Sequence, residues 1–150
     1  MKKVLALFAI LLILVIGIVI SQNYFKIPKP STATINNRVF KLELAKTHQE
    51  KEIGLSSKKR LDKNAGMLFP FEKPGYYSFW MKNMKFSIDI IYFNNGRIVT
   101  IHKNVSPPKD SNENLSIYNS SEPADTVLEI NAGLSEKYNF KEGDEVKLSL

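Results

Sequence analysis

The chain contains no cysteine, so it can form no disulfide and it offers no thiolate for redox chemistry or for a metal site. It contains two histidines, His48 and His102, and neither has a metal-ligand spacing to an acid or to the other histidine. No Gly-x-Ser-x-Gly, P-loop or Gly-x-Gly-x-x-Gly sequence occurs, which removes the usual support for a hydrolase or a nucleotide-phosphate site. The sequence therefore predicts no metal and no cofactor.

Basic residues outnumber acidic ones, and the formal net charge is +6 over 150 residues. Lys2 and Lys3 carry two of these charges, and the other lysines are scattered apart from the run Lys58-Lys59-Arg60. A basic pI is compatible with nucleic-acid binding, but scattered lysines are equally typical of a solvated surface near anionic lipid headgroups. We therefore do not expect nucleic acid as a partner.

Residues 4–20 form an unbroken apolar run behind Met1-Lys2-Lys3. As a helix this run would span roughly 26 Å, slightly less than a hydrocarbon core of ~30 Å. Tyr24 and Phe25 could extend it, because aromatic side chains favour the membrane interface. We expect a transmembrane anchor or uncleaved signal segment over residues 4–21, with the lipid bilayer as its partner.

A cleaved signal peptide is the alternative, and it would give a secreted protein. The apolar region of a signal peptide is usually shorter, about 7–15 residues, and ends in small residues. Val19-Ile20-Ser21 is a poor cleavage site, which favours an anchor. The early lysines then place the N-terminus in the cytoplasm and the rest of the chain on the extracytoplasmic side. Residues 22–34 contain two prolines and are expected to form an extended linker.

Residues 35–150 are expected to form one β-rich domain. Apolar residues alternate over 38–45, which predicts a half-buried strand, and Asn94-Asn95-Gly96 between two apolar runs is a strong hairpin signal. Thr47 and Glu50 fit a capping box at the start of a short helix. The pattern predicts a β-sandwich or a partly open barrel with two or three short helices. The other expected elements are strands at 67–71, 76–83, 126–130 and 145–150, a helix at 132–138 and a long polar loop at 103–125.

Several short motifs occur in a fixed order over about a hundred residues. They are Gly54-Leu55, Gly66-Met67-Leu68-Phe69, Phe79-Trp80-Met81-Lys82-Asn83, Asp89, Val127-Leu128-Glu129, Gly133 and Gly143-Asp144. With these motifs, residues 38–146 resemble the family called domain of unknown function 192. The chain departs from the family pattern at Ser56, where Met is usual, and at Met84, where Thr is usual. The resemblance implies a small, mainly β domain, often exported, with no settled activity.

Asp89 stands in an apolar strand over residues 86–93. Alternation places Ser87, Asp89, Ile91 and Phe93 on one face, and both faces are largely apolar. A buried carboxylate needs hydrogen bonds or a cation, and Lys82 and Asn83 are the expected partners. Two interpretations stay open: Asp89 ties strands or a loop together, or it contacts a ligand or acts as a general base with a shifted pKa.

Two further features suggest a site. Trp80, Lys82 and Met84 share one face and could line a cleft suited to flat or sugar-like ligands with an anionic group, although core packing is the alternative for Trp and Met. Glu129 lies in an apolar strand, where it could pair with Asp89 in a glycosidase-like site or form an ion pair with Lys82 or Arg97.

These observations give three hypotheses about function. The first is an envelope-exposed binding or accessory module for a small molecule, a glycan or a protein, with the 103–125 loop as a roof over its site. Its candidate ligand-binding residues are Trp80, Lys82, Asn83, Asp89 and Glu129. The second is a small envelope enzyme, acting on glycans through Asp89 and Glu129. The third is a structural partner of another membrane protein.

Overall fold

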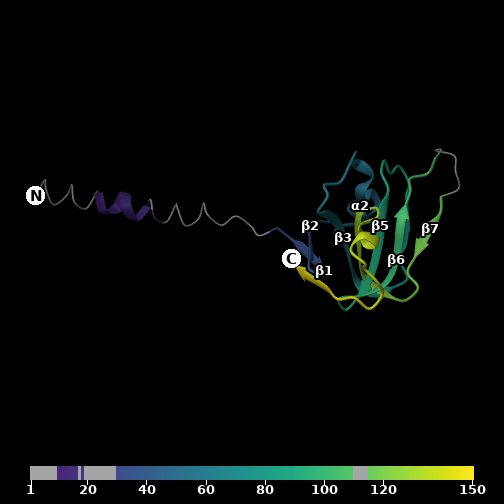
Figure 1. Cartoon of the computed structure of the whole chain (residues 1–150). Coiled ribbons are helices and arrows are strands. Elements are labelled where there is room, and N and C mark those ends of the chain that lie inside the picture. The colour runs from purple at the N-terminus through teal and green to yellow at the C-terminus, as the bar shows by residue number, and fades with distance from the viewer. Residues whose placement is uncertain (1–9, 17, 19–29, 110–114) are drawn as a thin grey trace, which may run out of the picture.

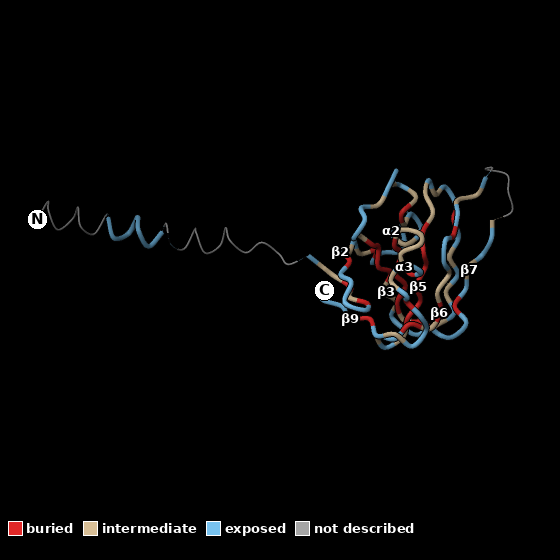
Figure 2. Tube along the Cα trace, in the orientation of Figure 1, coloured by how far each residue is buried: buried red, intermediate tan, exposed pale blue. Residues whose placement is uncertain are grey.

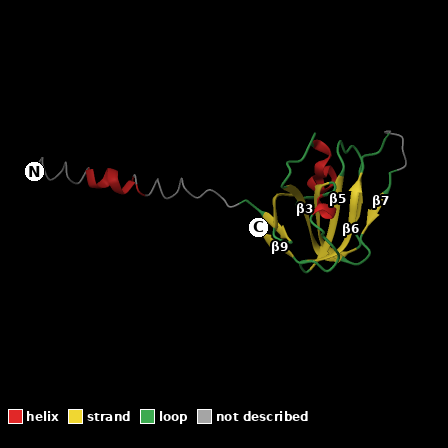
Figure 3. Ribbon diagram, viewed as in Figure 1, coloured by secondary structure: helices red, strands yellow, loops and turns green. Residues whose placement is uncertain are grey.

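The computed structural model describes residues 10–16, 18, 30–109 and 115–150. The domain that they form is mainly β, with a few short helical segments (Figures 1 and 3). Its helical segments are α2 (His48–Ile53), the 3-10 turn η1 (Gly54–Ser57) and α3 (Leu134–Lys137). Its strands are β1 (Thr32–Ile35), β2 (Arg38–Leu44), β3 (Ala65–Gly75), β4 (Ser78–Trp80), β5 (Ile88–Asn94), β6 (Arg97–Val105), β7 (Ile117–Asn119), β8 (Ala124–Asn131) and β9 (Val146–Ser149).

Seven strands form one sheet in the order β6-β5-β8-β3-β2-β1-β9, and β4 pairs with β7 in a separate two-stranded sheet. The edges of the large sheet meet at one end. Ile98 N–H donates to the Asp144 carbonyl at 3.0 Å, and Val146 N–H donates to the Gly96 carbonyl at 2.8 Å. These bonds join the start of β6 to the start of β9, so the sheet curls into a half-barrel. Of the two predicted architectures, the structure therefore has the partly open barrel.

The sheet has an apolar cluster on each face. Figure 2 shows the buried residues, in red, along the strands in the middle of the domain. The first cluster draws side chains from β1, β2, β3, β5, β6, β8 and β9, so it fills the inside of the curl. The second lies on the other face of β3, β5 and β8, where Leu55 of η1, Met81 and the partly buried Phe79 cover it. The β4–β7 sheet and the α2–η1 segment thus form a second layer over the middle of the large sheet.

Local signals in the sequence predicted several elements correctly. The capping box is present, since Glu50 N–H donates to Thr47 Oγ1 at 3.2 Å and Thr47 N–H donates to Glu50 Oε2 at 2.8 Å. Asn95 and Gly96 connect β5 to β6 with φ values of 47° and 70°, the positive values that such a hairpin turn requires. Strands β2, β8 and β9 and helix α3 also lie where the sequence predicted strands and a helix.

Other strands begin or end at residues different from those predicted, because pairing with other segments sets their bounds. Strand β1 begins at Thr32, inside the stretch expected to be a linker, because it pairs with both β2 and β9. The segment expected to be a loop over 103–125 contains the end of β6, all of β7 and the start of β8. The strand expected over 76–83 is only three residues long, because Met84 N–H donates to the Met81 carbonyl in a turn at 3.1 Å.

The expected membrane segment over residues 4–21 lies mostly outside the described residues. Within it, residues 10–16 and 18 are helical. No helix in the described part of the chain is both long enough and apolar enough to cross a membrane.

Gly66 allows β3 and β8 to approach closely. A Cβ atom at this position would lie 2.9 Å from the Glu129 carbonyl oxygen and 2.9 Å from Leu128 Cδ1. Because a backbone atom of a central strand blocks the space, we expect Gly66→Ala to push the strands apart. Overpacking of this kind costs about 1–3 kcal/mol, so the melting temperature should fall by several degrees in calorimetry. Gly75→Ala is the control, because its Cβ would meet only the Tyr77 side chain. Unchanged melting of Gly66→Ala would contradict the prediction.

Candidate functional site

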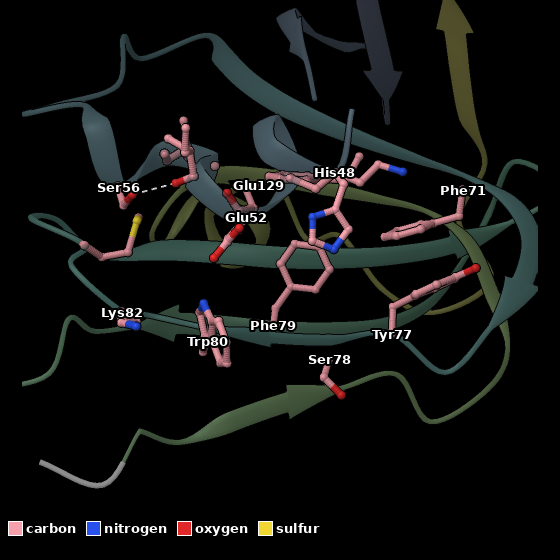
Figure 4. Close-up of a pocket in the computed structure, with 16 residues that line it drawn as sticks. His48, Glu52, Ser56, Phe71, Tyr77, Ser78, Phe79, Trp80, Lys82 and Glu129 are labelled. Carbon is pink, nitrogen blue, oxygen red and sulfur yellow. Dashed lines mark hydrogen bonds between the residues drawn. The ribbon is translucent and has the colours of Figure 1, made fainter. Parts of the chain in front are cut away.

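A cleft of about 380 Å³ opens between the α2–η1 segment and strand β4. His48 and Glu52 extend from α2 toward Phe79 and Trp80 of β4 (Figure 4). Residues of β3, β8 and the turn after β4 complete the lining. The cleft therefore lies in the second layer of the domain, above the middle of the large sheet.

Aromatic rings hold one another in place along the walls of the cleft. The Phe79 ring packs edge-on against Phe69 at a centroid distance of 5.0 Å and against the buried Tyr92 at 5.8 Å. Phe71 and Tyr77 stack with their centroids 3.5 Å apart and their planes 12° apart. These contacts fix β4 against β3 and β5, so the apolar walls are formed before any ligand binds.

Local backbone geometry explains how α2 faces this wall. Helix α2 ends at Ile53 and is capped by Gly54, whose φ of 49° is a conformation that few other residues adopt. The turn η1 follows directly and buries Leu55 in the apolar cluster below. A Cβ at Gly54 would lie 3.5 Å from the Phe69 ring, so the helix end and the aromatic wall are in close contact.

Glu129 is the buried acid of the cleft. Strand β8 runs between β3 and β5, with Glu129 directly opposite Met67 on one side and Ile90 on the other. The residue is 6% exposed, and its Oε2 atom has no hydrogen-bond partner among the described residues. Burial raises the pKa of this carboxyl from 4.5 to about 8. At neutral pH the group is therefore mostly protonated, and it can both donate and accept a hydrogen bond.

Tyr92 lies next to Glu129 on the same face of the sheet, but its hydroxyl does not hydrogen-bond to the Glu129 carboxyl. Its hydroxyl donates to the Tyr118 carbonyl of β7 at 2.7 Å. Burial, with a smaller contribution from the Glu129 charge, raises the pKa of Tyr92 above its ordinary value. The phenol therefore stays neutral and serves to hold β7 over the sheet.

Three of the five candidate residues predicted from the sequence come together in this cleft: Trp80, Lys82 and Glu129. Met84, predicted to share their wall, lines it as well. Trp80 is 50% exposed, and Lys82 Nζ lies 5.9 Å from the centroid of its ring. The cleft thus combines an open indole, an ammonium at the rim and a buried carboxylic acid.

Asp89 faces the other side of the sheet. It is fully buried, and its carboxylate accepts hydrogen bonds from the backbone N–H groups of Asn104 at 2.8 Å, Gly133 at 3.0 Å and Ser135 at 2.8 Å. The expected partners, Lys82 and Asn83, are replaced by these backbone donors. Asp89 thus joins β6 to the start of α3, as the structural interpretation predicted.

The structure also separates Asp89 from Glu129. Asp89 pairs in register with Ile130, whereas Glu129 pairs with Ile90. Since neighbouring residues of a strand point to opposite faces, the two carboxyls lie on opposite sides of the sheet. The paired-carboxylate arrangement considered for a glycosidase is therefore wrong.

Three other expectations about the site need correction. The expected ion pair of Glu129 is not formed: Lys82 is exposed, and Arg97 donates instead to the Gly143 carbonyl at 3.2 Å. Asn83 is exposed in a turn with a φ of 60° and does not line the cleft. The expected roof fails too, because no described residue of the 103–125 segment lines the cleft.

Sequence reasoning missed the residues on the helical side of the cleft. His48 and Glu52 are four positions apart in α2 and both line the cleft. Their spacing puts them on one helix face, and the capping box located the helix. No local signal, however, indicated that this face would lie opposite β4.

A family model for DUF192, described as an uncharacterized ACR, matches residues 31–148. The chain belongs to the DUF192 family. This match confirms the resemblance seen in the sequence motifs and extends it to nearly the whole described domain.

Two solved structures resemble this DUF192 chain. One is a protein of unknown function from Novosphingobium aromaticivorans, 33% identical, with a TM-score of 0.69, covering 79% of this chain and 83% of that one. The other, from Sinorhizobium meliloti, is named a candidate transcription regulator. It is 29% identical with a TM-score of 0.69, and the match covers 79% of this chain and 91% of that chain. No curated protein matches the chain.

Asp89→Asn should destabilise the fold without altering the cleft. An Asn side chain replaces one acceptor oxygen with an NH2 group, which would face a backbone N–H donor. Loss of charge-assisted bonds costs about 1.5–3 kcal/mol, so urea denaturation should show a clearly lower midpoint. The exposed substitution Asp62→Asn is the matched control and should change little. Equal midpoints for wild type and Asp89→Asn would contradict this role.

Glu129 should make stability fall as the pH rises. The folded protein keeps a proton on Glu129 up to about pH 8, whereas an unfolded chain loses it near pH 4.5. The unfolded state is therefore favoured progressively across this interval, by roughly 3 kcal/mol between pH 4.5 and neutrality. Urea denaturation over the interval should show this decline in the wild type and a flatter profile for Glu129→Gln. Parallel profiles would show that Glu129 does not carry the effect.

Proposed function

We propose that this protein is a membrane-anchored, envelope-exposed binding module that takes a small ligand in the cleft between α2 and β4. The observation that carries the proposal is the enclosed Glu129 Oε2, which faces an open, aromatic-walled cleft without a hydrogen-bond partner among the described residues. A buried polar atom without a partner costs about 1–3 kcal/mol. A ligand group placed against Glu129 would recover that cost.

The composition of the cleft supports the same conclusion. Ligand sites are concave and mostly apolar, and they contain a few polar groups that set orientation. Here the rings of Phe69, Phe79 and Trp80 supply apolar surface, while Glu129 and Lys82 supply polar groups at the floor and the rim. The half-exposed Trp80 also offers a flat platform to a sugar or an aromatic ring.

The membrane part of the proposal is supported by the sequence. The apolar run over residues 4–20 is long enough to act as an anchor, and Lys2 and Lys3 favour a cytoplasmic N-terminus. The domain begins with β1 at Thr32, so roughly ten residues would separate it from the bilayer. A module held at this distance would meet ligands of the cell envelope.

A ligand screen by thermal shift tests the proposal on the full chain in a nonionic detergent. We expect some sugars, small aromatics or amines to raise the melting temperature of the wild type, because a ligand at 100 times its Kd adds about 2.7 kcal/mol of stability. Glu129→Gln should lose this response. Glu136→Gln, which changes an exposed glutamate of α3 outside the cleft, is the matched control and should keep it.

Two results would overturn the proposal. One is a screen in which no compound stabilises the wild type. The other is a set of stabilising compounds that act equally on wild type and Glu129→Gln, since the ligand would then bind elsewhere.

A further inference from the structure

We infer that the cleft recognises an organic cation, a protonated amine or a guanidinium group, which pairs with the Glu129 carboxylate between aromatic walls. This inference rests on the proposed function, because it concerns the same cleft, and it names the chemical class of the ligand. Three observations carry it: the unpartnered acid, the cations already seated on the rings and the charges around the rim.

The acid at the floor is the group that a cation would change most. Glu129 Oε2 is enclosed, and the side chains directly opposite Glu129 in register, Met67 and Ile90, cannot hydrogen-bond to it. A neutral ligand would add one ordinary hydrogen bond to the protonated acid. A cation would convert the acid to a carboxylate and form a charge-assisted bond, which is roughly twice as strong.

The aromatic walls already hold cations from the chain itself. Lys51 Nζ lies 4.3 Å from the centroid of Phe71, and Lys82 Nζ lies 5.9 Å from that of Trp80. Ring faces attract cations electrostatically, more strongly where water is excluded. Both lysines sit at the sides of the cleft, and neither forms an ion pair with Glu129, so the floor is left for a cation from outside.

The charges around the cleft are compatible with such a ligand. Lys51 is engaged, since its Nζ donates to the Pro70 carbonyl, and Lys82 is exposed to solvent at the rim. Glu52 adds an exposed carboxylate on the helical side. The remaining titratable groups of the lining are His48 of α2 and Tyr77, whose hydroxyl donates to the Lys73 carbonyl. Tyr92 of β5 lies beside Glu129, and its hydroxyl is committed to the Tyr118 carbonyl.

Binding of a cation would release a proton from the protein. The proton leaves the Glu129 carboxyl for the buffer as the carboxylate pairs with the ligand, and no bond of the ligand changes. Because burial raises the pKa of Glu129 to about 8, only a minority of molecules carry the carboxylate at neutral pH. The apparent affinity is reduced by that fraction, so it should rise between about tenfold and a hundredfold from pH 6 to pH 8.

The test compares benzylammonium, benzyl alcohol and benzoate, which share a ring and differ in the charge of the head group. Calorimetry is done on the full chain in nonionic detergent. Proton release is measured at pH 6 in phosphate and in MES, which both buffer there, because the enthalpy difference between buffers counts the protons released. We expect benzylammonium to bind most tightly, to release close to one proton at pH 6 and to bind more tightly at pH 8. This readout needs only the wild type, so it does not depend on how a variant folds.

Two variants locate the effect. Glu129→Gln should lose the preference for benzylammonium, the proton release and the pH dependence. Glu136→Gln changes an exposed glutamate of α3 outside the cleft, and it should keep all three.

The outcomes separate this inference from the proposed function. Tighter, Glu129-dependent binding of benzyl alcohol or benzoate would overturn the cationic ligand and leave the cleft as a binding site. Absence of Glu129-dependent binding for all three probes, together with a negative ligand screen, would overturn both. Proton release and pH dependence that persist in Glu129→Gln would assign the proton to another group and would also overturn the inference.

Discussion

The arrangement of the domain depends on the burial of both faces of its central strands. β5 and β8 lie side by side in the middle of the large sheet, with one apolar cluster inside the curl and another under the second layer. Most of both faces is therefore shielded from water, and burial of a polar side chain on these strands costs free energy unless it finds a partner. Asp89 and Glu129 are the two buried carboxyls on these strands.

The two acids meet the constraint in opposite ways. Asp89 is surrounded by backbone N–H groups from β6 and from the turn into α3, so its charge is used to fix a connection of the fold. Glu129 lies between apolar side chains and keeps its proton instead. Asp89 is fully buried and already bonded to the backbone, so a ligand cannot reach it. The group that is left unsatisfied beside a cleft is the one with a reason to bind, and this difference moves the candidate site from Asp89 to Glu129.

Local patterns in the sequence predicted much of the fold, including the strand alternation, the capping box at Thr47 and the turn at Asn95-Gly96. They could not predict β7 or β1, because these short strands are defined by partners far away in the chain, β4 for the one and β9 for the other. The same limit applies to the site. Trp80, Lys82 and Glu129 stood out as residue types in unusual places, but only the tertiary structure sets α2 opposite β4. Alternation along β5 and along β8 does not say whether Asp89 and Glu129 share a face. That also requires the register between the two strands, which the sequence does not give.

The position of β1 also has a mechanical consequence. β1 is bonded along its length to β2 on one side and to β9 on the other, antiparallel in both cases, and the C-terminus lies beside it (Figure 1). Antiparallel hydrogen bonds run perpendicular to the strands. A pulling force transmitted through the residues before Thr32 would therefore load both ladders in shear, so that their bonds would have to break together rather than one after another. A domain tethered through this strand would resist extraction by tension on its N-terminal side.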